Sequence, residues 1–157
     1  MLTIRPIRPS DLEKLARFFE RNDTAATRRQ FHPFPLTEDS ARALVRGGGS
    51  DAYFVGEDGD EIAAFAMLRG WDEGFETPSF GVLVDAARRR GSLGRRMLEH
   101  ALAHGRERGC RGVRLSVYES NAAAVRLYES LRFEVVSAEP VVVAGEPDVR
   151  IVMHRGI

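Results

Sequence analysis

Apolar positions recur along this chain with two spacings, and each spacing predicts a different element. Alternating apolar and polar residues, or a short apolar run bounded by turn residues, are typical of a strand, whereas a spacing of three to four is typical of a helix. The pattern predicts strands at residues 2–7, 52–56, 61–68, 80–84, 113–117, 133–137 and 149–154. It predicts helices that begin near residues 10, 37, 93 and 121. Strands and helices alternate in the second half, which indicates an α/β domain built in layers.

Residues near the predicted helix starts support these boundaries. Ser10, followed three residues later by Glu13, has the pattern of a capping box. Thr37 is expected to cap the second helix, because its hydroxyl can accept a hydrogen bond from the first helical turn. Residues 28–36 contain two prolines and are predicted to be irregular.

Composition is consistent with a single soluble domain over residues 1–157. The chain is 43% apolar, and 23 basic residues balance 23 acidic ones, so no net field favours nucleic acid or an anionic membrane as a partner. One cysteine rules out an intrachain disulfide and fits a reducing compartment. Neither a secretory signal nor a stretch long enough to span a membrane stands out, so we expect a cytoplasmic protein.

The segment from Val82 to Arg96 has the features of an anion-binding site. A buried strand leads into a turn of small residues and arginines, and a helix follows. A helix start presents unpaired backbone N–H groups and a partial positive charge, and small residues let a phosphate come close to them. The spacing is neither a P-loop nor a dinucleotide fingerprint. The alternative is a flexible turn that carries solvated arginines.

A second segment, Asn121 to Phe133, places polar and small residues on one face of a helix. Asn121 stands where it can cap the helix and still reach a ligand. Ala124 and Tyr128 are four residues apart and so share a face. The alternative interpretation of Tyr128 is a half-buried aromatic residue with its hydroxyl at the surface.

Together these two segments resemble the GNAT superfamily of N-acetyltransferases. The run Arg89 to Gly94 is similar to the family's Gln/Arg-x-x-Gly-x-Gly/Ala motif, with Ser92 in place of the first glycine. The run from Asn121 to Phe133 is similar to its Asn-x-x-Ala-x-x-Leu-Tyr-x-x-x-Gly-Phe segment, with Arg132 in place of the glycine.

The resemblance implies a fold, a co-substrate and a reaction. The fold would be a mixed, mostly antiparallel sheet of about seven strands with helices on both faces. Acetyl-CoA would be the co-substrate, and an acetyl group would pass directly to an amine of a small molecule or peptide in a ternary complex. The predicted coenzyme-binding residues are Val82, Leu83, Val84, Arg89, Arg90, Gly91, Ser92, Leu93, Gly94, Arg95, Asn121, Ala124 and Tyr128.

Acetyl transfer needs an acid for the departing thiolate, and Tyr128 is the predicted acid. A phenol has an ordinary pKa near 10 and so stays protonated at neutral pH. The base is left open between Glu73, in an acidic loop with Asp72 and Glu76, and His32. The acidic loop and His32 are also the predicted substrate-binding residues. A solvated loop and a structural histidine are the respective alternatives.

Two other classes of function compete with the acetyltransferase. One is a non-catalytic acyl-CoA-binding or regulatory module on the same fold, and the other is a phosphate-binding domain for a different nucleotide. The second does not account for the segment that begins at Asn121. No metal is expected, because the histidines lack the spacing of metal ligands with acidic or cysteine partners. A homodimer is left open.

Overall fold

The computed structural model describes residues 1–89 and 91–157. The strands are β1 (Leu2–Pro6), β2 (Ala52–Asp58), β3 (Glu61–Arg69), β4 (Ser79–Val84), β5 (Gly112–Tyr118), β6 (Glu134–Val143) and β7 (Glu146–Gly156). The α-helices are α1 (Leu12–Asn22), α2 (Ala25–Gln30), α3 (Glu38–Arg46), α4 (Leu93–Glu107) and α5 (Ala122–Ser130). Single 3₁₀ turns span Pro9–Asp11, Trp71–Glu73 and Ala86–Arg88.

The strands form one seven-stranded sheet in the order β1-β2-β3-β4-β5-β7-β6. Every neighbouring pair is antiparallel except β4 and β5, which are parallel. This arrangement confirms the predicted mixed, mostly antiparallel sheet of about seven strands. No described helix is long and apolar enough to cross a membrane.

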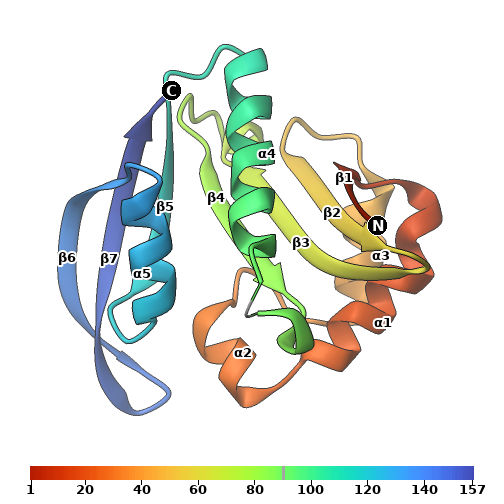
Figure 1. The fold of residues 1–157 in the computed structure, drawn as a ribbon, viewed down its shortest axis with the longest axis horizontal. Coiled ribbons are helices and arrows are strands. Elements are labelled where there is room, and N and C mark those ends of the chain that lie inside the picture. Colours follow the sequence, from red (N-terminus) through yellow and green to blue (C-terminus); the bar gives the residue numbers. More distant parts are fainter. Residues whose placement is uncertain (90) are drawn as a thin grey trace.

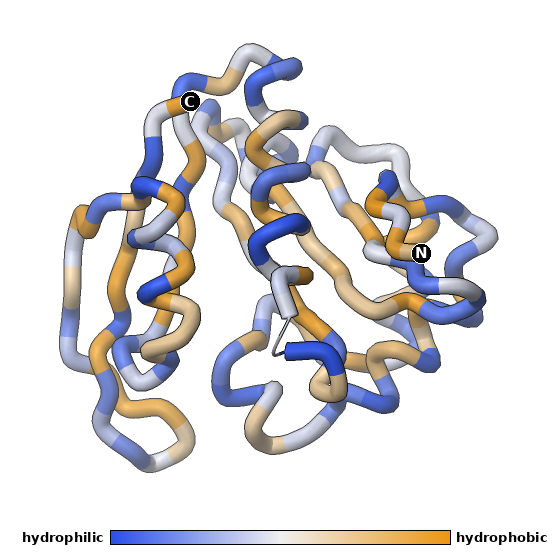
Figure 2. Tube along the Cα trace, viewed as in Figure 1, coloured by the Kyte–Doolittle hydropathy of each residue, from blue (hydrophilic) through white to orange (hydrophobic). Residues whose placement is uncertain are grey.

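Helices cover both faces of the sheet, as predicted (Figure 1). Helices α4 and α5 pack on one face, where Met97, Leu98 and Leu102 are almost completely buried. Helices α1 and α3 pack on the other face around Phe19 and Phe65, whose rings meet edge to face. Figure 2 shows the apolar positions gathered along the central strands between these two layers. Because side chains alternate along a strand, β2, β3 and β4 contribute to both cores.

The sheet opens between its two parallel strands. β4 and β5 pair only at Ser79 with Arg114 and at Phe80 with Leu115. β5 then continues along β7 through seven residue pairs, whereas β4 continues along β3. The described pairing therefore leaves the rest of β4 without a strand on its β5 side. Such a gap exposes backbone groups of β4 to whatever enters it.

Three predictions about helices and strands are wrong: the cap of α1, the irregular segment at residues 28–36, and the lengths of β6 and β7. Ser10 does not cap α1; it lies in the 3₁₀ turn, because Asp11 accepts the N–H of Arg8 at 2.7 Å and pairs with Arg5. A helix, α2, begins before residue 28 and overlaps the segment predicted to be irregular. Thr24 caps it by accepting the N–H of Thr27 at 3.2 Å.

The last two strands are also much longer than the apolar pattern predicts. β6 and β7 continue past residues 137 and 149 to a tight turn, where Ala144 and Gly145 both have positive φ, of 50° and 82°. A two-residue turn of this kind suits the twist of a hairpin. Backbone pairing extends the strands even though most of β6 is exposed, and exposed positions need not alternate in hydropathy.

Candidate active site

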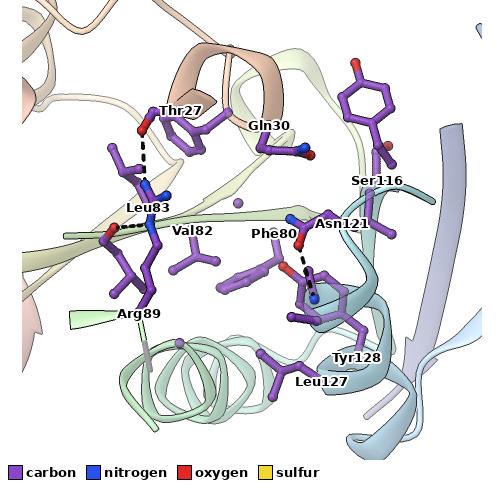
Figure 3. Close-up of a pocket in the computed structure, with 18 of the residues that line it drawn as sticks. Thr27, Gln30, Phe80, Val82, Leu83, Arg89, Ser116, Asn121, Leu127 and Tyr128 are labelled. Carbon is purple, nitrogen blue, oxygen red and sulfur yellow. Dashed lines mark hydrogen bonds between the residues drawn. The ribbon is translucent and has the colours of Figure 1, made fainter. Parts of the chain in front are cut away.

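A cavity of about 910 Å³ occupies the opening between β4 and β5. Its wall is formed by α2, β4, the turn before α4, β5 and α5. Figure 3 shows Thr27 and Gln30 on one side of it and Leu127 and Tyr128 of α5 on the other. The volume lies at the upper end of the range that is typical of small-molecule sites.

Four of the residues predicted to bind the coenzyme form one end of the cavity, at the start of α4. They are Gly91, Ser92, Gly94 and Arg95. A Cβ added at Gly94 would meet only Leu127 and Val84, at the ordinary contact distances of 3.7 and 3.8 Å, so the backbone here is not tightly covered. Leu93, by contrast, is buried in the core and is not in the wall, and Arg90 lies outside the described residues.

Arg89 connects two elements at this end of the cavity. Its guanidinium donates to the carbonyl of Val84 at 3.2 Å and to the hydroxyl of Thr27 at 3.0 Å. These bonds, drawn in Figure 3, join the end of β4 to helix α2. Arg89 lines the cavity as predicted, but its guanidinium already holds two protein groups.

Helix α5 presents the other predicted residues to the cavity. The amide oxygen of Asn121 accepts the N–H of Ala124 at 3.3 Å and so caps the helix. Ala124 and Tyr128 both line the wall, as their four-residue spacing predicts. The helix start therefore carries one polar side chain beside a small residue, which leaves room for a ligand.

The end of α5 fixes the ring of Tyr128. The N–H of Phe133 donates to the carbonyl of Tyr128, and that of Arg132 donates to Glu129, both at 3.0 Å. This 6→1 and 5→2 pair of bonds is a Schellman motif, which normally has glycine at the left-handed position. Arg132 occupies that position with φ of 67°, so the turn keeps the conformation that glycine would adopt. The rings of Tyr128 and Phe133 pack 6.0 Å apart.

We expect Arg132→Gly to stabilise the protein. A non-glycine residue in the left-handed region costs about 1–2 kcal/mol, and the greater freedom of glycine in the unfolded chain offsets about half of that. Urea unfolding should therefore show a free energy of unfolding higher by about 0.5–1 kcal/mol. Arg126→Gly, within α5, should instead lower it by about 1 kcal/mol. A loss of stability in the Arg132 variant would show that its side chain makes a contact that outweighs the strain.

Burial keeps the Tyr128 phenol protonated. The side chain is 7% exposed, and desolvation raises its pKa to about 12. The phenol lies in the cavity wall with Phe80, at the point where the two parallel strands part. A protonated phenol there can donate a proton to a group inside the cavity.

The cavity passes through the sheet to its other face. Leu115 and Val117 of β5 belong to the core under α4 and α5, so Ser116 and Tyr118 point to the opposite side. Arg150 of β7 stands opposite Tyr118 in the strand register, and all three polar residues line the cavity. Sequence reasoning missed them, because their shared face appears only once the pairing of β5 with β7 is known.

His32 lies at this second opening. Its Nε2 is 2.8 Å from the hydroxyl of Tyr118, and both residues line the cavity. The predicted substrate-binding histidine and the predicted acid are therefore both in the cavity wall, although they come from distant parts of the chain.

The predicted acidic loop is placed elsewhere. The carboxylate of Asp72 accepts the N–H groups of Ser50 and Asp51, at 2.6 and 3.4 Å, and these bonds lower its pKa. The adjacent Trp71 lies under Arg108, just past the last residue of α4. A 15-residue helix is about 22 Å long, so the loop lies near the end of α4 that is remote from the glycine turn.

Glu73 and Glu76 are exposed and do not line the cavity. The three acidic residues predicted for substrate binding are thus not brought together with Tyr128. Their loop has a local structural role, since Asp72 and Asp51 bind backbone N–H groups across it.

Comparison with known proteins identifies the family of this chain. Residues 13–133 match the acetyltransferase (GNAT) family. The chain is 36% identical over 102 residues to the ribosomal protein bS18-alanine N-acetyltransferase of Escherichia coli, an alignment that spans 65% of this chain and 66% of that relative. It is 38% identical over 84 residues to N-alpha-acetyltransferase 40 of Saccharomyces cerevisiae, covering 49% of this chain and 29% of that one.

Solved structures share the whole fold. The crystal structure of the Escherichia coli ribosomal-protein-S18-alanine N-acetyltransferase superposes with a TM-score of 0.77 at 27% identity, over 100% of this chain and 94% of that one. The structure of yncA from Salmonella typhimurium, with its cofactor acetyl-CoA, gives a TM-score of 0.81 at 22% identity over 99% and 93%, a likeness of fold alone. With the match over residues 13–133, these findings show that the chain belongs to the GNAT acetyltransferase family.

Proposed function

We propose that this chain is an N-acetyltransferase that moves an acetyl group from acetyl-CoA to an amine by direct transfer in a ternary complex. Residues 1–157 would act as one domain. A single observation carries the proposal: one continuous cavity joins the glycine turn at the start of α4 to the phenol of Tyr128 and opens on the other face of the sheet. Donor and acceptor can therefore enter from opposite sides and meet at Tyr128.

The donor end of the cavity fits a coenzyme A diphosphate. Backbone N–H groups of the first turn of α4, between Ser92 and Arg95, would bind the phosphate oxygens, helped by the helix dipole. Beyond Phe80, the free side of β4 can pair with the amide groups of the pantetheine arm in the manner of an added strand. The carbonyl of Val84 is already bound to Arg89, so Val82 is the better placed of the two predicted partners.

The reaction then follows from the groups in the wall. The amine nitrogen attacks the thioester carbonyl carbon, the new amide C–N bond forms, and the C–S bond breaks. Tyr128 gives its phenolic proton to the departing thiolate. His32, on the acceptor side, takes the proton that the amine must lose, with its ring oriented by Tyr118. Alignment of the two reactants can contribute about 7–11 kcal/mol to lowering the barrier.

Neither Glu73 nor Cys110 enters this proposal. Glu73 is exposed and lies outside the cavity wall. Cys110, the single cysteine of the chain, follows α4 and is also outside the wall, which favours direct transfer over a cysteine acetyl-enzyme.

Ligand-induced stabilisation tests the proposal. Acetyl-CoA at about 100 times its Kd should stabilise the native state by about 2.7 kcal/mol and raise Tm by about 5–10 °C, because it binds only the folded chain. ATP at the same concentration should cause no shift. A shift with ATP and none with acetyl-CoA would favour the phosphate-binding domain instead.

Thiol release on a panel of amines then separates an enzyme from a non-catalytic module. Release that depends on both acetyl-CoA and an amine is expected, whereas binding without turnover on any amine would support the module. The His32→Gln variant should lower kcat with little change in the Kd for acetyl-CoA, and an unchanged kcat would remove His32 from the mechanism. The names of the relatives favour the α-amine of a peptide as one acceptor to include.

Several expectations from the sequence stay predictions. They are a cytoplasmic location, a possible homodimer, and the absence of a metal, of a nucleic-acid partner and of a membrane partner.

A further inference from the structure

The guanidinium of Arg150 lies at the acceptor end of the cavity, and it constrains the substrate. Among the residues that the structure describes, the cavity wall holds no aspartate or glutamate. Arg150 supplies a guanidinium on the acceptor face, beside Ser116 and Tyr118. Asp148 accepts a hydrogen bond from Ser120, which lines the wall. The carboxylate of Asp148 is also paired with Arg29 at 2.9 Å, so its negative charge is balanced.

Arg150 is held in place by bonds that a ligand can replace. One of its nitrogens donates to the hydroxyl of Ser116 at 3.0 Å, and another lies 3.4 Å from a carboxylate oxygen of Glu139. The side chains of Arg150 and Glu139 are 43% and 62% exposed, and an exposed ion pair of this kind contributes little to stability. The guanidinium can therefore turn its planar donors to a carboxylate inside the cavity, which is the partner that their fork geometry fits.

Resting on the proposed function, we propose that the acceptor is an amine that carries a carboxylate near its amino group, and that Arg150 binds this carboxylate. An amino acid, or a peptide with an acidic residue close to its N-terminus, has this chemistry. A polyamine does not, because its additional ammonium groups would face Arg150 with no carboxylate of the wall to offset them.

Paired substrates isolate the contribution of the carboxylate. Thiol release is measured at saturating acetyl-CoA with the common amino acids and their amides, with short peptides carrying aspartate or asparagine at the second position, and with spermidine. The wild-type protein should use the carboxylate member of a pair with a kcat/KM about 10- to 100-fold higher than its neutral partner. The arm that shows this preference identifies the source of the carboxylate, either a free amino acid or a peptide side chain.

The Arg150→Gln variant should abolish that preference. Its kcat/KM for the carboxylate substrate should fall to the value for the neutral substrate, mainly because KM rises. Its kcat/KM for the neutral substrate should change by less than about threefold. Arg150→Lys should restore part of the preference, because it keeps the charge without the planar fork. Arg114→Gln is the matched control: Arg114 lies two residues before Ser116 on the same face of β5, is exposed, and is outside the wall.

The outcomes separate this inference from the proposed function. Equal or better turnover of amides or spermidine, or an unchanged preference in Arg150→Gln, would overturn the inference and leave the acetyltransferase intact. Absence of turnover with every amine, in a protein that acetyl-CoA stabilises, would reject the proposed function and the inference with it. An unchanged acetyl-CoA shift in each variant establishes that it is folded.

Discussion

Tyr128→Phe should lower kcat by about 10²–10⁴-fold, the usual range for a lost acid–base group. Tyr128 is buried in the wall where the cavity crosses the sheet, and burial raises the pKa of its phenol to about 12. The wild-type phenol therefore stays protonated well above neutral pH, and its proton is available across the working range. Phenylalanine keeps the ring that packs on Phe133 and removes only the hydroxyl.

Binding and folding should survive this substitution. The Kd for acetyl-CoA and the free energy of unfolding should both stay close to those of the wild-type protein, so the loss should appear in kcat rather than in KM. Tyr53→Phe provides a control, since Tyr53 stacks on Phe65 outside the cavity wall and should leave kcat unchanged. An unaltered kcat in the Tyr128 variant would remove the phenol from the mechanism.

Gly94→Glu should raise the Kd for acetyl-CoA by about 100-fold, which corresponds to about 2.7 kcal/mol. Gly94 lies in the first turn of α4, where the backbone is open to the cavity. A carboxylate placed there would repel the diphosphate. At an effective dielectric constant near 20, two charges about 4 Å apart interact by about 4 kcal/mol, so even a partly screened repulsion is sufficient.

The same substitution should not destabilise the free protein. A carboxylate in the first turn of a helix interacts favourably with the dipole, and a Cβ added at Gly94 meets no atom closer than 3.7 Å. Arg96→Gln changes the net charge by the same amount on the exposed side of α4 and should alter the Kd by less than about threefold. Isothermal titration of the three proteins measures the difference. Equal affinities would place the diphosphate away from the start of α4.

The features that could be predicted from the sequence are local ones. Hydropathy alternation and short apolar runs located the seven strands, because side chains alternate between the faces of a sheet and a strand covered on both faces is apolar throughout. Thr37 and Asn121 marked helix starts, because a cap needs only the N–H groups of the next turn. The spacing of Ala124 and Tyr128 placed both on one helical face, and both line the cavity.

Where local signals were weak, prediction failed for physical reasons. Asp11 is drawn into an ion pair with Arg5 of β1, and Asp11 rather than Ser10 becomes the residue that precedes α1. The hairpin of β6 and β7 extends through backbone pairing that leaves no pattern in exposed side chains. The acidic loop looked like part of a site because its charges cluster in sequence, yet Asp72 uses its charge to bind backbone N–H groups of Ser50 and Asp51.

By itself, then, the sequence determined the positions of the seven strands and of α3, α4 and α5, and the helix face that holds the phenol, since each depends on neighbours within a turn or two. Tertiary structure alone decided that β4 and β5 part after Phe80, so that a cavity crosses the sheet. It also decided that His32, Ser116 and Arg150 meet on the acceptor side. Ser116 and Arg150 come together through the pairing of β5 with β7, and His32 reaches them from the loop after α2 through its contact with Tyr118. The direction of each strand side chain follows from the register of pairing between distant segments.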